Sequence, residues 1–294
     1  MFYYQPSWNQ ETTEAPIRAL VSLTSAESKR LIAKGVAVLP EIKQALEQGI
    51  VAIGRGTTNA FVVEEITGQT LEPKCHYVAG IIVDGELSVV PQGTRLKPIA
   101  LRNGTPVSMA PNEIIHEFGE RDVFIKGANA VDAEGNAGVL AASEVGGTIG
   151  AVLAIILARG SYLIVPVGLE KLIPSVEQAA RAAGIFRFKY STGLPTGLVP
   201  IPNALVVTEV QAFQVLTGVK AVPIAAGGVA GSEGTVVLSL EGKAAQIEQA
   251  LSLVKSIKGE PAVGRPSSRA NPPAADLNYD AMEQWYVLHP EFRR

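Results

Sequence analysis

Residues 50–59 read Ile-Val-Ala-Ile-Gly-Arg-Gly-Thr-Thr-Asn, an apolar run followed by two glycines and three polar residues. The apolar run predicts a buried strand over residues 50–53, and the residues after Gly56 predict the first turn of a helix. A tight turn of this kind directs backbone N–H groups and the positive end of the helix dipole toward one point. The stretch therefore predicts an α/β fold with an anion-binding loop, although the same residues also suit a plain strand-to-helix connection with an ordinary cap.

Short apolar runs that resemble strands alternate with helical patterns over the first two thirds of the chain. The capping-box spacing from Thr24 to Glu27 predicts the start of an early helix, and the pair Asp84-Gly85 predicts a hairpin. The strand-like runs are residues 77–83, 87–90, 122–125 and 162–167, and helical segments follow Thr58, Gly147 and Pro174. This alternation predicts a Rossmann-like, largely parallel sheet flanked by helices, in a domain over residues 1–199.

The pattern of elements changes in residues 200–260. A strand over 201–207, a helix after Thr208, two strands over 220–226 and 235–240, and a helix over 243–257 follow one another. The order β-α-β-β-α is typical of a ferredoxin-like plait, so we expect a smaller ferredoxin-like α+β domain there.

Residues 261–294 form the last predicted region. The Pro-, Ser- and Arg-rich stretch 261–273 is typical of an extended linker. The segment that follows it is too apolar for a free tail and is expected to dock on this chain or on a neighbouring subunit, which favours a homo-oligomer. Its large apolar residues are Met282, Trp285, Tyr286, Leu288 and Phe292.

Charge and cysteine content narrow the classes of partner. The chain has 294 residues and a formal net charge of -3, so no basic surplus favours binding to nucleic acid or to an anionic membrane. Cys75 is the only cysteine, which excludes an internal disulfide and a thiolate-rich zinc site. The first residues lack a signal-peptide pattern, so a cytoplasmic location is expected, and no motif predicts a metal or another cofactor.

A second glycine-framed segment, residues 122–132, reads Asp-Val-Phe-Ile-Lys-Gly-Ala-Asn-Ala-Val-Asp and carries polar groups at the end of another predicted strand. We expect this segment and the loop after residue 53 to face one pocket that holds a small anionic metabolite. The candidate ligand-binding residues are Gly54, Arg55, Gly56, Thr57, Thr58, Asn59, Gly127, Asn129, Gly147 and Thr148.

Lys126 and Asp132 are the candidate catalytic residues. A lysine at a strand end beside glycines is suited to clamp an anion, or to act as a base or amine nucleophile if burial lowers its pKa. The alternative for Lys126 is a structural ion pair with Asp122 or Asp132. Asp132 is the best candidate to move a proton, and its alternative role is that of a solvated turn carboxylate.

Both glycine-framed segments resemble known families. Residues 52–61 resemble the strand-loop-helix of type A ribose-5-phosphate isomerase. Residues 122–135 resemble a segment of that isomerase, of the ligand-sensing domain of DeoR-type sugar-phosphate regulators and of methylthioribose-1-phosphate isomerase. These families belong to the superfamily of glucosamine-6-phosphate deaminase, ribose-5-phosphate isomerase and coenzyme A transferases. The resemblance implies a Rossmann-like sheet and a phosphorylated ligand.

The chain departs from the isomerase pattern at the residues that carry its chemistry. The isomerase segment has an Asp-Gly-Ala-Asp core, whereas this chain has Lys126-Gly127-Ala128-Asn129. An amide accepts no proton near neutral pH, so carboxylate-based enediol chemistry is not carried over. The first hypothesis is therefore an isomerase-like enzyme with altered catalytic residues that binds a sugar phosphate. The alternatives are a non-catalytic ligand sensor or assembly protein and, as a third option, a coenzyme A transferase or thioester hydrolase that uses Glu144.

Overall fold

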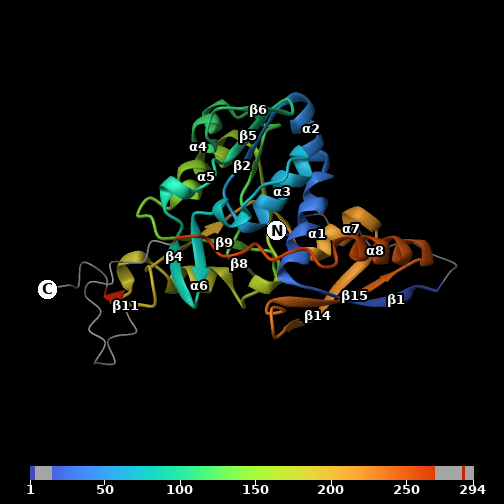
Figure 1. Ribbon diagram of the computed structural model, residues 1–294. Helices are drawn as coiled ribbons and strands as arrows, with labels where there is room; N and C mark the ends of the chain where they lie inside the picture. Colours follow the sequence, from blue (N-terminus) through green and yellow to red (C-terminus); the bar gives the residue numbers. More distant parts are fainter. Residues whose placement is uncertain (4–14, 269–286, 289–294) are drawn as a thin grey trace.

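The computed structural model describes residues 1–3, 15–268 and 287–288. The chain is an α/β protein with one mixed six-stranded sheet and several smaller antiparallel sheets (Figure 1). The described residues form eight α-helices, and none of these helices is long and apolar enough to cross a membrane.

The six-stranded sheet is parallel in its centre and antiparallel at one edge. Its order is β13-β10-β7-β2-β5-β6, with parallel pairing from β13 to β2 and antiparallel pairing of β2 with β5 and of β5 with β6. The predicted strands at 50–53, 122–125 and 162–167 are confirmed. The strands are β2 (Ile50–Ile53), β5 (Ile99–Arg102), β6 (Thr105–Val107), β7 (Val123–Ile125), β10 (Tyr162–Pro166) and β13 (Leu205–Val207).

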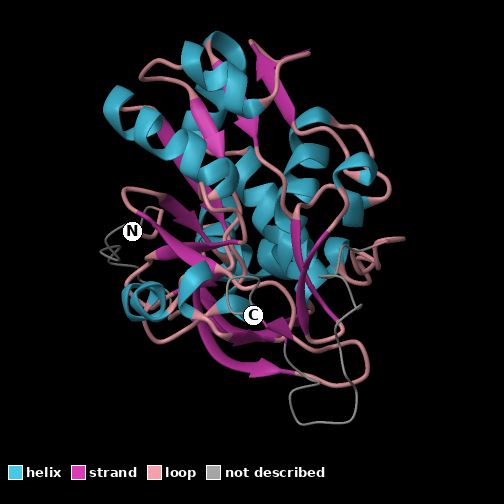
Figure 2. Ribbon diagram, turned by 90° about the vertical axis from the view of Figure 1, so that its left-hand side faces the viewer, coloured by secondary structure: helices cyan, strands magenta, loops and turns pink. Residues whose placement is uncertain are grey.

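Helices cover both faces of this sheet because its central strands are apolar on both sides. Val51, Ile53 and Ile125 pack on one face against α1, α2 and α3, while Ala52 and Phe124 pack on the other against α4 and α5 (Figures 1 and 2). Figure 1 shows α2 and α3 on one side of β2 and α4 and α5 on the other. The helices are α1 (Ser25–Ala37), α2 (Pro40–Gln48), α3 (Thr57–Thr67), α4 (Pro111–Ile114) and α5 (Gly147–Arg159).

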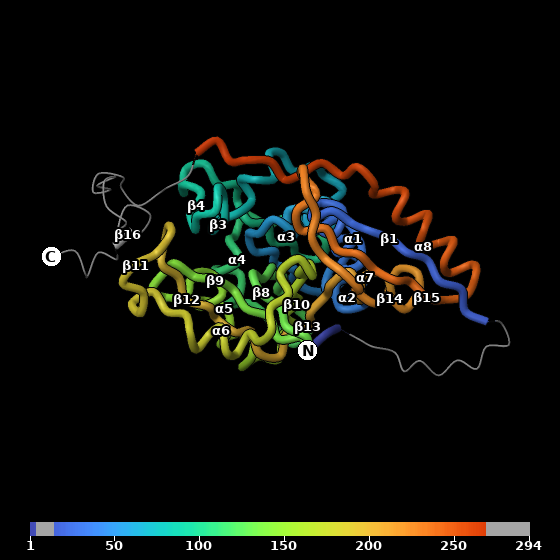
Figure 3. Tube along the Cα trace, turned by 90° about the horizontal axis from the view of Figure 1, so that it is seen from below, coloured from blue at the N-terminus to red at the C-terminus, as the bar shows by residue number. Residues whose placement is uncertain are grey.

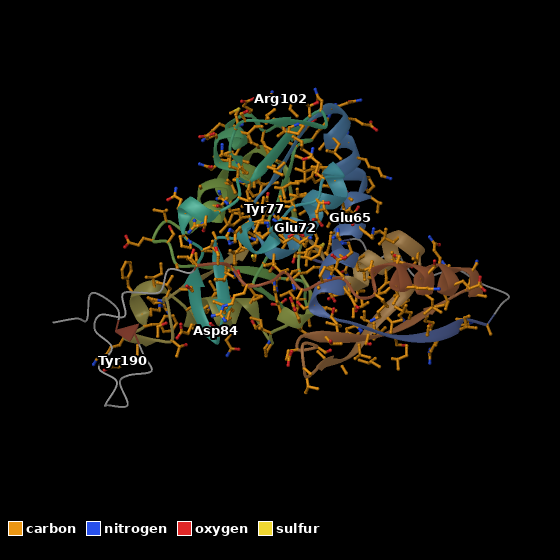
Figure 4. The ribbon with its side chains drawn as sticks, viewed as in Figure 1. Glu65, Glu72, Tyr77, Asp84, Arg102 and Tyr190 are labelled. Atoms are coloured by element: carbon orange, nitrogen blue, oxygen red, sulfur yellow. The ribbon has the colours of Figure 1, made fainter. Side chains whose placement is uncertain are left out.

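The predicted capping box at the start of α1 is confirmed. The Glu27 amide donates to Thr24 Oγ1 at 3.3 Å, and the Thr24 amide donates to Glu27 Oε2 at 2.9 Å. Farther along α1, Arg30 forms ion pairs with Glu64 and Glu65 of α3, and its guanidinium lies 4.7 Å from the centre of the Phe61 ring. These contacts hold α1 against α3, where Figure 4 labels Glu65.

A second sheet has three antiparallel strands in the order β1-β15-β14. Its inner face packs on α7 and α8. The chain segments that pair here are far apart in the sequence, and Figure 3 shows β1 beside β15. The elements are β1 (Ile17–Leu23), α7 (Glu209–Thr217), β14 (Lys220–Gly227), β15 (Thr235–Gly242) and α8 (Ala244–Ile257).

The ferredoxin-like expectation is therefore wrong about its first strand. Residues 205–207 pair with β10 in the large sheet, and β1 joins β15 instead. The small sheet thus combines segments from both sides of the boundary expected at residue 200. A short apolar strand fits any buried sheet equally well, so its pattern does not say which sheet it joins.

The remaining strands form small antiparallel units. The hairpin predicted at Asp84-Gly85 is confirmed by β3 (Gly80–Val83) and β4 (Glu86–Val89), which lie outside the large sheet. Of the apolar C-terminal residues, only Leu288 is described, in β16, while Met282, Trp285, Tyr286 and Phe292 lie outside the described residues. The other elements are α6 (Val176–Ala182), β8 (Ala130–Val131), β9 (Ala137–Ala141), β12 (Gly197–Ile201), and β11 (Tyr190–Ser191) paired with β16 (Val287–Leu288).

Asp122 ties together the amino ends of the three central strands. Its buried carboxylate accepts from the Ile50 amide and from the Gly119 amide, each at 2.6 Å. Its carbonyl oxygen accepts from the Tyr162 amide at 2.9 Å. Gly49 leaves room for this carboxylate, because a Cβ at residue 49 would lie 2.7 Å from Asp122 Oδ1.

Replacing Asp122 with Ala should therefore destabilise the fold. The change leaves two backbone amides without their acceptor, which we expect to cost about 2–4 kcal/mol in the free energy of unfolding. Urea unfolding measures this cost. The control is Glu177→Ala, which removes a solvent-exposed ion pair with Arg181 and should cost less than about 0.5 kcal/mol. Equal costs for both variants would contradict the proposed role of Asp122.

Candidate functional site

A cavity of about 540 Å³ lies where β2 and β7 end. Both glycine-framed loops line it, together with the first turn of α5 and the hairpin β3–β4. Asp84 marks the tip of that hairpin in Figure 4. The volume lies within the range of about 300–1,000 Å³ that is usual for small-molecule sites.

Parallel pairing places the two loops beside one another. Ile53 of β2 is in register with Ile125 of β7, so both strands end at the same level. The ladder continues one residue further, since the Gly54 amide donates to Ile125 O at 2.9 Å and the Lys126 amide donates to Ile164 O at 3.0 Å. In open α/β sheets, ligands bind outside the carboxyl ends of parallel strands, which is where this cavity lies.

Tyr77 and Asn59 hold the first loop from behind. Tyr77 is fully buried in the interior (Figure 4), its hydroxyl donates to Ile53 O at 2.8 Å, and its carbonyl accepts from the Gly56 amide at 2.9 Å. The buried Asn59 amide donates to Gly54 O at 2.7 Å. Gly54 and Asn59 therefore support the loop and do not line the cavity.

Lys126 extends into the cavity without a counterion. Its Nζ lies 3.4 Å from Arg55 O and 3.4 Å from Gly127 O, and within the described residues it forms no ion pair. The alternative pairing with Asp122 or Asp132 is wrong, because both carboxylates bind backbone amides elsewhere. Burial, together with the neighbouring charge of Lys171, lowers the pKa of Lys126 to about 8.

Lys171 lines the same cavity and was not among the predicted site residues. Its Nζ donates to Ala128 O at 3.0 Å. Burial, with the nearby charge of Lys29, lowers the pKa of Lys171 to about 8. The signal that points to Lys171 is its position five residues after β10, at the same sheet edge as Lys126.

Two arginines complete the set of basic groups. Arg55 Nε donates to Leu96 O at 2.8 Å, and Arg95 Nε donates to Val90 O at 2.6 Å. Burial and the charge of Arg95 lower the pKa of Arg55, and burial lowers that of Arg95. A guanidinium stays protonated in proteins, so both remain cationic at neutral pH. Arg95 was also missed, because no local pattern marks it.

The charged side chains that line the cavity are all positive. Among the residues in the described ranges 1–3, 15–268 and 287–288, four basic side chains and no Asp or Glu line it. The N-termini of α3 and α5 also open onto it, and their N-caps are Gly56 and Gly146, which have no side chain to accept from the first-turn amides. Helix N-termini favour anions, so these amides add to the attraction of the four cations.

Asp132 and Glu144 do not reach the cavity wall. The Asp132 carboxylate accepts from the Asn136 amide at 2.9 Å and from the Val176 amide at 3.0 Å, so it holds the start of α6. Burial opposes its ionisation, but the hydrogen bonds outweigh burial and lower its pKa. This geometry is that of a structural carboxylate, and it does not support a proton transfer by Asp132, whereas Glu144 is an exposed residue.

Most of the other predicted residues meet in the cavity. The half-buried Thr57 and the buried Thr58 bring hydroxyl groups to it, and Asn129 Oδ1 accepts from the Leu140 amide at 3.0 Å. The predicted residues that line the cavity are Arg55, Gly56, Thr57, Thr58, Lys126, Gly127, Asn129, Gly147 and Thr148.

Comparison with known proteins adds no assignment to this geometry. No protein-family model, curated protein or solved structure matches the chain.

Proposed function

We propose that the protein binds a small phosphorylated metabolite, with sugar phosphates as the first class, in the cavity between the two glycine-framed loops. The observation that carries this proposal is the concentration of four basic side chains and two helix N-termini around a cavity that no carboxylate of the described residues lines. Like charges placed together repel one another, and a phosphate group relieves this repulsion. In this arrangement the α3 amides, Thr57 and Thr58 hold the phosphate.

The fold supports the same class of ligand. The parallel strands β2 and β7 end at the cavity, and a glycine turn joins β2 to α3, as in the Rossmann-like superfamily of sugar-phosphate isomerases and coenzyme A transferases. We propose that the six-stranded sheet belongs to this superfamily. An isomerase-like enzyme of this form uses amines in place of the usual carboxylates, with Lys126 and Lys171 next to the ligand.

A non-catalytic ligand sensor is the second candidate. The observation in its favour is the position of Asp132, whose carboxylate is occupied by backbone amides outside the cavity. A sensor needs only the anion-binding groups. Incubation of the protein with sugar phosphates, followed by NMR detection of new products, separates the two candidates, because a sensor binds the compounds and leaves them unchanged.

Replacing Lys126 with Met should change stability and binding in opposite directions. The folded-state pKa of about 8 lies below the value of 10.5 for an ordinary lysine, so the protonated amine destabilises the folded state. This cost in the free energy of unfolding is fully present below about pH 8. At pH 7 the unliganded variant should therefore melt a few degrees higher than the native protein. Its affinity for ribose 5-phosphate should fall at least about tenfold, because the phosphate loses a partly buried cation.

Thermal-shift and calorimetric titrations measure both effects. The matched control is Lys43→Met, which removes an exposed lysine on α2 far from the cavity lining and should leave the affinity unchanged. Unchanged affinity in Lys126→Met would remove Lys126 from the binding site. If the native protein shows no shift with any sugar phosphate, the proposed ligand class is wrong.

Affinity for the phosphorylated ligand should weaken as the pH rises from 7 to about 9. Lys126 and Lys171, each with a pKa of about 8, lose their charge over this range, whereas lysines with ordinary pKa values keep it. For each lysine that must be protonated in the complex, the loss of its proton should reduce the affinity about tenfold between pH 7 and pH 9. Calorimetry at constant ionic strength measures this dependence. An affinity that stays flat to pH 9 would show that neither amine binds the anion.

A further inference from the structure

The amine of Lys126 differs from the other three cavity cations in its contacts. Lys171 donates a hydrogen bond of 3.0 Å and lies near the charges of Glu170 and Glu209, and each arginine is anchored through Nε. Within the part of the chain that the structure describes, Lys126 Nζ has two polar contacts, each at 3.4 Å and each with a backbone carbonyl. Its amine is therefore the one least constrained by hydrogen bonds to the protein.

The stem of Lys126 is held in place. A Cβ at residue 54 would lie 3.1 Å from Lys126 Cδ, so Gly54 leaves the space that the stem occupies. The backbone of Lys126 is fixed at the end of β7 by its hydrogen bond to Ile164 O. The amine is thus presented to the cavity from a rigid strand end, which suits a group that must meet a ligand atom in a defined geometry.

The surroundings also favour the neutral, nucleophilic form of this amine. With a pKa of about 8, about a tenth of Lys126 is neutral at pH 7, compared with less than about a thousandth for an exposed lysine. A lysine that is desolvated and placed beside a second cation is the usual arrangement for an amine that attacks carbonyl carbons. Here the second cation is Lys171.

We propose that Lys126 forms an imine with the carbonyl carbon of a phosphorylated aldehyde or ketone bound in the cavity. This inference rests on the proposed function, which supplies a ligand whose phosphate is held by the loop after β2. The bond between Nζ and the carbonyl carbon forms, the carbon–oxygen bond breaks, and both amine protons leave with the oxygen as water. No oxidant, reductant or metal takes part in this step.

Borohydride trapping tests the imine directly. The probes are ribose 5-phosphate and dihydroxyacetone phosphate, and their carbonyl-free counterparts are ribitol 5-phosphate and glycerol 3-phosphate. Borohydride supplies hydride to the imine carbon, so the intact protein should gain the mass of one carbonyl probe less one oxygen atom. Peptide mapping should place the adduct on Lys126, and the carbonyl-free compounds should give none.

Two substitutions separate nucleophilic attack from anion binding. Lys126→Arg keeps the positive charge but has no nucleophilic amine, so it should still bind the probes and give no adduct. Lys43→Met removes an exposed lysine and should give the adduct in the same yield as the native protein. Lys126→Met serves as a second adduct-free variant if Lys126→Arg fails to fold.

The possible outcomes distinguish this inference from the function on which it rests. A thermal shift with the carbonyl probes but no adduct, or an adduct on exposed lysines alone, overturns the imine and leaves the anion-binding site in place. Neither shift nor adduct with any probe overturns both. An adduct on Lys126 that requires the carbonyl and disappears in Lys126→Arg supports the imine.

Discussion

The parallel register of β2, β7 and β10 is the constraint on which the site depends. Asp122 fixes the amino ends of these strands, and the shared register makes their carboxyl ends level. The loops that follow must then lie side by side, because the hydrogen-bond ladder extends into their first residues. Segments that are about 70 residues apart in the sequence thereby bring Arg55 and Lys126 to one cavity.

This arrangement concentrates positive charge at a cost in stability. Burial lowers the pKa of Lys126 and of Lys171, and a neighbouring positive charge, that of Lys171 for Lys126 and that of Lys29 for Lys171, lowers each pKa further. Elsewhere the protein pairs its buried cations, as Lys29 does with Glu170 at 2.8 Å. Unpaired, partly buried charges are typical of functional sites, and this is the physical reason for proposing an anionic ligand for this cavity.

Much of the architecture follows from local sequence. Helix α1, its capping box, the glycine turn after β2 and the hairpin at Asp84 are all recognisable, since apolar period, cap chemistry and turn chemistry act over a few residues. The partner of β13 is not recognisable, because three apolar residues pack equally well in either sheet. The pairing of the N-terminal strand β1 with β15 is not recognisable either, because more than 200 residues separate the paired residues Ile17 and Gly242 and no local pattern links them.

In the candidate site, too, the features that depend on a few neighbouring residues are predictable, and those that depend on long-range packing are not. The glycine loops are predictable because glycine and hydroxyl residues have a local meaning. Lys171 and Arg95 were missed because only the folded sheet and the hairpin bring them to the cavity. The geometry does not support the role predicted for Asp132, because an Asp in a turn has the same sequence pattern whether it faces a ligand or accepts from the amide of Val176.

NMR titration of the lysine side-chain Cε and Hε signals, with and without inorganic phosphate, tests the cationic cavity most directly. In the free protein two lysine signals should titrate near pH 8, and assignment by the Lys126→Met and Lys171→Met variants should identify them. Phosphate should raise the pKa of both lysines toward ordinary values, because a bound anion stabilises their charged forms. If every lysine titrates near its ordinary pKa, or if phosphate moves neither signal, the cavity is not the anion site described here.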